Sequence, residues 1–343
     1  MEERKLGTIR YFIGIDIGKA TFNYCIRYGE GQVINGKVAN RLEPINEFIL
    51  MLKDLTGCKI NYIVFGMEST GIYGNVLIET LSKLKAKFVV EPALRIKNSL
   101  GLIRGKSDKL DAARIARYLI KNLHELRLWA PRREVIAELD SLSTLRRRIV
   151  KIHGIMTVPL KEDESFIIQE VSQMNIDLCN PLVSELQRSL NEIDSRLKHL
   201  WTQDEKCRRL MQIMLSVMGI GPVTALQILI HTNEFKSITN ARAFASFCGV
   251  APFEYNSGTS VKKASRVSHY ANKRIKSLLH TGVIVLITND PETKAYYKRR
   301  VEVDKKNKMS TMNAIKFKLI CKVFACVRGD RLYDRNYISV KSE

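Results

Sequence analysis

The sequence lacks any long apolar run, and this absence argues against an integral membrane protein. No segment approaches the run of about eighteen apolar residues that a membrane-spanning helix needs, and the apolar stretch Thr281–Thr288 is too short. The first residues, MEERKLGTIR, contain no hydrophobic region of a secretory signal. We therefore expect no membrane span and a cytoplasmic location.

Paired metal-binding motifs are also missing. The seven cysteines are an odd number and form no CxxC pair, and the six histidines form no HxxxH pair. This pattern argues against a disulfide framework and against a zinc site, and it favours a reducing compartment.

Acidic residues are scarce relative to basic ones. The 343 residues include 56 Lys and Arg but only 35 Asp and Glu, which gives a formal net charge of +21. Such a charge attracts polyanions, and nucleic acid is the first candidate, although anionic lipid or a merely basic soluble protein stays possible. With 45% hydrophobic residues, the chain can bury the cores of two or three domains.

The first part of the chain predicts a mixed α/β sheet. Three short β-rich runs, expected to form an antiparallel meander, precede an alternation of helices and strands. The expected strands are Tyr11–Asp16, Ala20–Arg27, Gln32–Val38, Tyr62–Met67 and Lys87–Val90, and the expected helices are Pro44–Leu55 and Ile72–Leu84.

Four acidic residues fall at special places in this pattern. Asp16 and Glu68 end two otherwise apolar strands, and ligands gather at the carboxyl ends of strands in open α/β sheets. Asp108 and Asp111 lie three apart in the segment Gly105–Leu119, so on a helix they share one face. Carboxylates this close repel unless a cation such as Mg²⁺ lies between them. The alternative for Asp108 and Asp111 is a helix cap and a first-turn acid, which favour the helix dipole.

The run GIDIGKATF also resembles the first phosphate-binding hairpin of actin-like ATPases and sugar kinases. That fold needs a second Asp-rich hairpin and a Gly-rich adenosine loop downstream, and the sequence contains neither. A cluster around one or two Mg²⁺ ions is therefore the favoured interpretation, and it is the constellation used in phosphoryl transfer.

The middle of the chain predicts two long helices. Val183, Leu186, Leu190, Ile193, Leu197 and Leu200 step by three and four residues, as in a heptad seam. We expect breaks at Val158-Pro159 and Asn180-Pro181. The helices would form a coiled coil that dimerises the protein, or an ordinary helical hairpin in a monomer.

The last part combines glycines, a serine and a basic run. Gly219 and Gly221, followed by Pro222, resemble a helix-hairpin-helix element whose amides hold a phosphate. Ser257 lies in a turn signal and is followed by six basic residues with no intervening acid. Two interpretations of Ser257 are open, a nucleophile and a plain turn serine. These basic residues are candidate nucleic-acid contacts: Lys262, Lys263, Arg266, Lys273, Arg274 and Lys276.

Motifs along almost the whole chain, in the right order, resemble one family. The runs GIDIGKATF, GMESTGIY and GKSDKLDAARIA, followed by VMGIGPVTA and FASFCGVAPFEYNSG, are similar to those of the DEDD transposases. These are insertion-sequence recombinases guided by a bridge RNA, with the Piv invertase as a relative. The resemblance implies an RNase H-like, RuvC-type domain (1–128), a coiled-coil dimerisation region (129–208) and a mainly helical C-terminal domain (209–343).

The same resemblance implies the chemistry. The acidic quartet maps onto Asp16, Glu68, Asp108 and Asp111, and the nucleophilic serine onto Ser257, with Ser260 nearby as the rival. Such an enzyme would use two Mg²⁺ ions and form a transient serine–DNA link. Its partners would be donor and target DNA, a guide RNA and further copies of the chain, as a dimer or tetramer near a bacterial or archaeal nucleoid. The alternatives are a resolvase-type nuclease that uses water and a non-catalytic nucleic-acid-binding protein.

Overall fold

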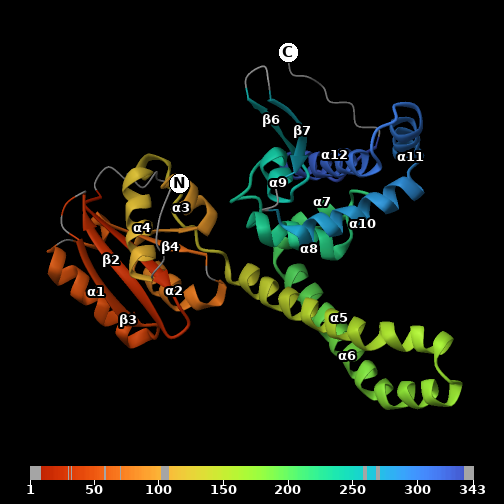
Figure 1. Cartoon of the computed structure of the whole chain (residues 1–343), viewed down its shortest axis with the longest axis horizontal. Coiled ribbons are helices and arrows are strands. Elements are labelled where there is room, and N and C mark those ends of the chain that lie inside the picture. Colours follow the sequence, from red (N-terminus) through yellow and green to blue (C-terminus); the bar gives the residue numbers. More distant parts are fainter. Residues whose placement is uncertain are drawn as a thin grey trace. The chain divides into compact units, whose positions relative to one another are not determined.

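The computed structural model describes residues 9–29, 31, 33–57, 59–69, 71–101, 108–257, 261–267 and 271–335. The chain divides into two compact units (Figure 1). Unit 1 ends at Pro131 and unit 2 begins at Arg132. The finer division at residues 128 and 208 stays a prediction.

Unit 1 contains the expected mixed sheet. The strand order is β3-β2-β1-β4-β5, with β1, β4 and β5 parallel and β1, β2 and β3 antiparallel. The strands are β1 (Tyr11–Ile17), β2 (Thr21–Tyr28), β3 (Val33–Ala39), β4 (Ile63–Glu68) and β5 (Lys87–Glu91). The predicted strands and the meander are confirmed, and the sheet is consistent with an RNase H-like architecture.

Helices cover both faces of this sheet (Figure 1). They are α1 (Leu42–Thr56), α2 (Asn75–Lys83), α3 (Ala93–Ser99) and α4 (Asp108–Lys121), with 3-10 turns at Ile60–Tyr62, Gly71–Gly74 and Leu123–Glu125. Helices α1 and α2 pack on Ile13, Ile15 and Phe65. On the opposite face α4 packs on Phe12 and Val64. The helix expected from Ile72 is therefore shorter, since its first residues form a 3-10 turn.

Glycines let α4 lie directly on the sheet. A Cβ atom at Gly14 of β1 would collide with the α4 backbone at Ala112 and Ala116. A Cβ atom at Gly66 of β4 would lie 2.9 Å from the Leu119 side chain. Any larger residue at Gly14 would push α4 away from the strand ends that it covers.

Unit 2 is mainly helical and has one core. Its elements are α5 (Glu134–Phe166), α6 (Gln169–Gln203), α7 (Glu205–Leu215), α8 (Pro222–Thr232), α9 (Ala241–Phe247), β6 (Pro252–Ser257), β7 (Val261–Val267), α10 (Lys273–Asn289), α11 (Pro291–Lys298), a π-helical turn (Arg299–Val303) and α12 (Lys308–Arg328). In the parts of the chain that the structure describes, no helix has the length and apolar character to cross a bilayer.

The prediction of helix breaks at the two prolines was wrong. Pro159 lies inside α5 and Pro181 lies inside α6, and the two helices instead meet at residues 167–168. A proline removes one helical hydrogen bond, but it does not end a helix whose freed carbonyl can reach water. The carbonyl released by Pro159 belongs to Ile155, which is 60% exposed.

The heptad seam packs within a single chain. Leu190, Ile193 and Leu197 are buried, and Ile193 and Leu197 share a core with Ile136 and Leu139 of α5. This half of the seam is therefore covered inside unit 2, whereas Val183, Leu186 and Leu200 are only partly buried. That the two helices dimerise the protein stays a prediction.

Candidate catalytic edge and nucleic-acid interface

Two predicted acids end neighbouring strands. Ile15 of β1 pairs with Met67 of β4 in parallel register, so the next residues, Asp16 and Glu68, stand side by side. Side chains alternate along a strand, so both acids lie on the face of Gly14 and Gly66 that α4 covers. Both side chains are half-buried.

The first turn of α4 lies over the same edge. Ala112 and Ala116 sit on Gly14, whereas Leu119, later in the helix, clusters with residues that precede Gly14 and Gly66 in their strands. The helix therefore runs from the carboxyl ends of the strands toward their amino ends. Its first residues, which include Asp108 and Asp111, begin at the carboxyl edge.

Asp111 has a close cationic partner. The Arg114 guanidinium Nη1 donates to its Oδ1 at 2.5 Å, and the Asp111 side chain is a quarter exposed. The Asp108 side chain lies outside the described part of the structure. Among the described residues, no three or more His, Cys, Asp or Glu side chains approach closely enough to hold a metal ion. The structure thus gathers Asp16 and Glu68 at one edge but does not complete a metal site from the three quartet members it describes.

The donor set at this edge nevertheless suits a hard divalent cation. All four candidate ligands offer carboxylate oxygens, which Mg²⁺ prefers over nitrogen or sulfur. Two of them are adjacent in register, so their mutual repulsion favours a cation between them.

A third acid at the edge was missed by sequence reasoning. Glu91 ends β5 and pairs in register with Glu68. Its buried carboxylate accepts two contacts from Arg95 Nη1, at 3.0 and 3.3 Å. Burial, aided by the negative charge of Glu91, raises the pKa of Tyr118 to about 12. The only sequence signal was an acid at the end of a third strand.

Ser257 is the last residue of a strand. β6 and β7 form an antiparallel hairpin in which Ser257 pairs with Val261. The turn predicted at Asn256-Ser257-Gly258 is wrong for its first two residues, because Asn256 and Ser257 are still paired with β7. Lys262, Lys263 and Arg266 lie on β7, in the strand directly after the turn. Ser260 lies outside the described residues.

The glycine turn before α8 has two different roles. Gly219 has φ of +89°, and its Cβ would lie 2.9 Å from the Gly282 carbonyl oxygen. Its close backbone approach is therefore to α10 of its own chain, and the predicted contact of this turn with a phosphate stays a prediction. Gly221 is exposed, caps α8 and precedes Pro222, as predicted. A groove of about 440 Å³ opens beside Gly221. Its lining includes Thr224, which is 6% exposed and which no sequence pattern indicated.

Two family models match the chain. A DEDD transposase model matches residues 13–153, and the model described as "Transposase IS116/IS110/IS902 family" matches residues 211–298. The chain belongs to the IS116/IS110/IS902 family of transposases. It is therefore an enzyme that acts on DNA, and the predicted family is confirmed.

Named relatives agree with this assignment. The pilin gene-inverting proteins of Moraxella bovis and Moraxella lacunata are each 27% identical over 94% of this chain and 98% of their own length. An uncharacterised 43.6 kDa protein of insertion element IS110 from Streptomyces coelicolor is 24% identical over 45% of this chain and 38% of its own length.

The first turn of α10 carries two predicted basic contacts of this transposase. Asn272 caps the helix through the Ile275 amide at 3.1 Å. Lys273 is exposed, and its contact with nucleic acid stays a prediction. Arg274 instead donates to Ser143 at 3.3 Å, and burial together with the nearby Arg147 lowers its pKa. Of the two side chains, Lys273 is therefore the more accessible to a partner.

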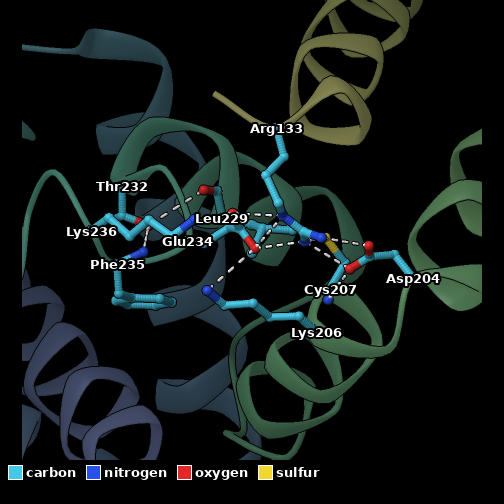
Figure 2. Close-up of polar contacts among 9 residues, drawn as sticks. All are labelled: Arg133, Asp204, Lys206, Cys207, Leu229, Thr232, Glu234, Phe235 and Lys236. Carbon is cyan, nitrogen blue, oxygen red and sulfur yellow. Dashed lines mark hydrogen bonds and ion pairs between the residues drawn. The ribbon is translucent and has the colours of Figure 1, made fainter. Parts of the chain in front are cut away.

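A buried ionic cluster was also missed. Figure 2 shows Arg133, at the start of unit 2, between Asp204 and Glu234. The Glu234 side chain is fully buried and follows α8 with φ of +58°. Lys206 and Lys236 approach it at 3.7 and 3.0 Å. Glu234 lies 101 residues from Arg133 in the sequence, so no local sequence pattern indicates that the two side chains pair.

Proposed function

We propose that this transposase cuts and rejoins DNA at the ends of an insertion sequence through a serine nucleophile. Asp16, Glu68, Asp108 and Asp111 would hold two Mg²⁺ ions, and Ser257 would form the transient bond to DNA. The observation that carries the proposal is the placement of Asp16 and Glu68 on one sheet face, under the start of the helix that bears Asp108 and Asp111.

The metal ions, when bound, would activate the attacking oxygen and stabilise the leaving oxygen of an in-line displacement. The chain's own contribution at this edge is positioning. Gly14 and Gly66 allow α4 to lie close enough for its first turn to reach the strand ends. Arg114 orients Asp111 through their short ion pair.

The serine step balances without an external reagent. Ser257 Oγ bonds to the scissile phosphorus, the bond to one strand oxygen breaks, and the strand leaves as a hydroxyl. A strand hydroxyl then attacks the phosphoserine and releases the serine. The first Asp, Glu or His after Ser257 is His269, twelve residues later, so activation would come from the acidic quartet. Lys262, Lys263 and Arg266 would offset phosphate charge.

The partners follow from charge and exposed surface. A net charge of +21 suits both DNA and a guide RNA, with Lys273 and the exposed α8 turn at Gly221 as backbone contacts.

A second copy of the chain would cover the far half of the α5–α6 hairpin, where large apolar side chains are exposed. These are Ile152, Ile155, Val158, Phe166, Ile168, Met174, Leu178 and Leu182.

Denaturing electrophoresis of labelled element-end DNA tests the proposal. Wild type with Mg²⁺ and its co-purified RNA should give a covalent protein–DNA adduct. Ser257→Ala should abolish the adduct and recombination while DNA binding remains, and Ser260→Ala is the matched control. Loss of the adduct in Ser260→Ala alone would reassign the nucleophile. Cleavage by the wild type without any adduct would favour the resolvase-type mechanism with water.

A second candidate reaction is DNA inversion. The relatives that match over nearly their whole length are named as gene-inverting proteins. Inversion and transposition share the same cutting and rejoining steps and differ in how the ends are paired. A plasmid carrying two inverted element ends separates the two reactions, since inversion flips the segment and transposition excises it.

A further inference from the structure

Glu91 continues the row of acids along the carboxyl edge of the sheet. It pairs in register with Glu68, and Val89, two residues earlier, lies in the core beneath α4. Glu91 therefore points to the same face as Asp16 and Glu68. It is not one of the four acids assigned to the metal site.

The surroundings of Glu91 differ from those of the other acids. Its side chain is 7% exposed, and its ion-pair partner Arg95 is 42% exposed. Taking a carboxylate out of water to hold one half-exposed arginine gives little net stability, and an apolar residue would cost less at this position. The pair therefore has the character of a positioning device rather than a stabilising one.

The free side of Arg95 is available to a ligand. Nη1 makes both contacts to Glu91, and within the described residues the other guanidinium nitrogens have no hydrogen-bond partner. A guanidinium fixed on one side by a carboxylate presents its remaining N–H groups in a planar fork, which matches phosphate oxygens. On the sheet side, the buried Tyr118 packs near the Glu91 carboxylate and stays neutral.

A DNA phosphate at the carboxyl edge of the sheet needs a nearby positive charge. The edge carries Asp16, Glu68 and Glu91 in adjacent strands, and these charges repel a DNA phosphate. A bound metal offsets only the charges that it touches. A strand that crosses from the metal site over β5 would next meet Arg95.

We propose that Arg95 contacts a backbone phosphate of the DNA strand that enters the catalytic edge, and that Glu91 is its positioning residue. The inference rests on the proposed function, because it takes the edge formed by Asp16 and Glu68 as the place of strand cleavage. It adds a substrate contact from β5 and α3 that the acidic quartet does not contain.

The test compares Arg95→Gln, Arg95→Lys and Glu91→Gln with the matched control Lys97→Gln, which removes one charge from the same short helix. Each full-length variant is measured for thermal unfolding, for the salt dependence of DNA affinity and for single-turnover cleavage. We expect Arg95→Gln to lower the salt-dependence slope by about 0.9, the value of one phosphate contact. Cleavage should fall roughly tenfold or more, as when one charged donor is lost from a reaction centre.

Arg95→Lys should restore part of the salt dependence, and Glu91→Gln should slow cleavage while the salt slope stays near that of wild type. Unfolding temperatures should stay unchanged. The inference is overturned if Arg95→Gln behaves like Lys97→Gln, or if its main effect is a lower unfolding temperature. If wild type fails to cleave with Mg²⁺, the proposed function fails, and the salt slope alone still decides whether Arg95 meets a phosphate.

Discussion

Replacing Arg133 with methionine leaves a carboxylate buried without its main partner. Arg133 donates to Asp204 at 2.7 Å through two nitrogens and to Glu234 at 2.7 to 3.1 Å. Removing one member of a buried ion pair costs about 3–5 kcal/mol. Lys206 and Lys236 remain near Glu234, and Arg133 is 36% exposed, so we expect the lower end, about 3 kcal/mol. For a unit of this size the unfolding temperature should fall by roughly 6–12 °C.

The same cluster sets a dependence of stability on acid. Hydrogen bonds from Arg133 lower the pKa of Asp204. Burial alone would raise the pKa of Glu234, but the hydrogen bonds from Arg133 and Lys236 outweigh it, and the pKa is lowered. The unfolded state therefore binds more protons in mild acid, and the contribution to stability is complete above the ordinary values of about 4. It is lost as the pH falls through the folded-state pKa values. In Arg133→Met this acid dependence should shrink.

Thermal unfolding followed by circular dichroism at pH 7 and at a pH of about 2, below the ordinary carboxyl values, measures both effects. Arg146→Met is the matched control, because Arg146 lies on α5, the helix that Arg133 directly precedes, and pairs with the half-exposed Asp194 at 2.5 Å. Exposed pairs contribute less than about 1 kcal/mol, so the control should change little. If Arg133→Met loses no more stability than Arg146→Met, the buried cluster does not anchor the start of α5.

The remaining predictions concern the catalytic edge, the glycine turn and the hairpin. Asp16→Asn should abolish Mg²⁺-dependent strand cleavage. The metal-free variant should unfold at an equal or higher temperature, because its repulsion with Glu68 is relieved, and clear destabilisation would mark Asp16 as structural. Gly219→Ala should destabilise by about 1–3 kcal/mol in thermal unfolding, whereas Gly221→Ala, with open space around it, should be near neutral. Met174→Glu combined with Leu178→Glu should shrink the oligomer in light scattering without unfolding the chain, and an unchanged mass would rule out the far half of the hairpin as the interface.

The strands of unit 1 were predictable because their signals are local. Alternation of apolar residues and punctuation by Gly29, Gly31 and Pro92 place each strand within one residue. The helix breaks were not predictable in this way. A proline disfavours a helix locally, but α5 and α6 continue through Pro159 and Pro181, since each proline costs one hydrogen bond and the freed carbonyl can reach water.

The same distinction between local and long-range signals applies to the candidate site. Asp16 and Glu68 could be assigned because the ends of parallel strands share one edge. Glu91 pairs with Arg95 only four residues away, but its place beside Glu68 follows only from the sheet register. Gly219 was recognised as special, but its actual neighbour is Gly282, which lies on another helix. Spacing along the chain carries no information about such contacts.

Neither unit contains all the residues proposed for catalysis. The acidic quartet belongs to unit 1, whereas Ser257 ends a strand of unit 2. The two units meet in sequence between Pro131 and Arg132, and the next residue, Arg133, is held in unit 2 by Asp204 and Glu234. If the active site is shared between copies of the chain, a mixture of Ser257→Ala and Asp16→Asn proteins should regain the recombination that each variant alone lacks.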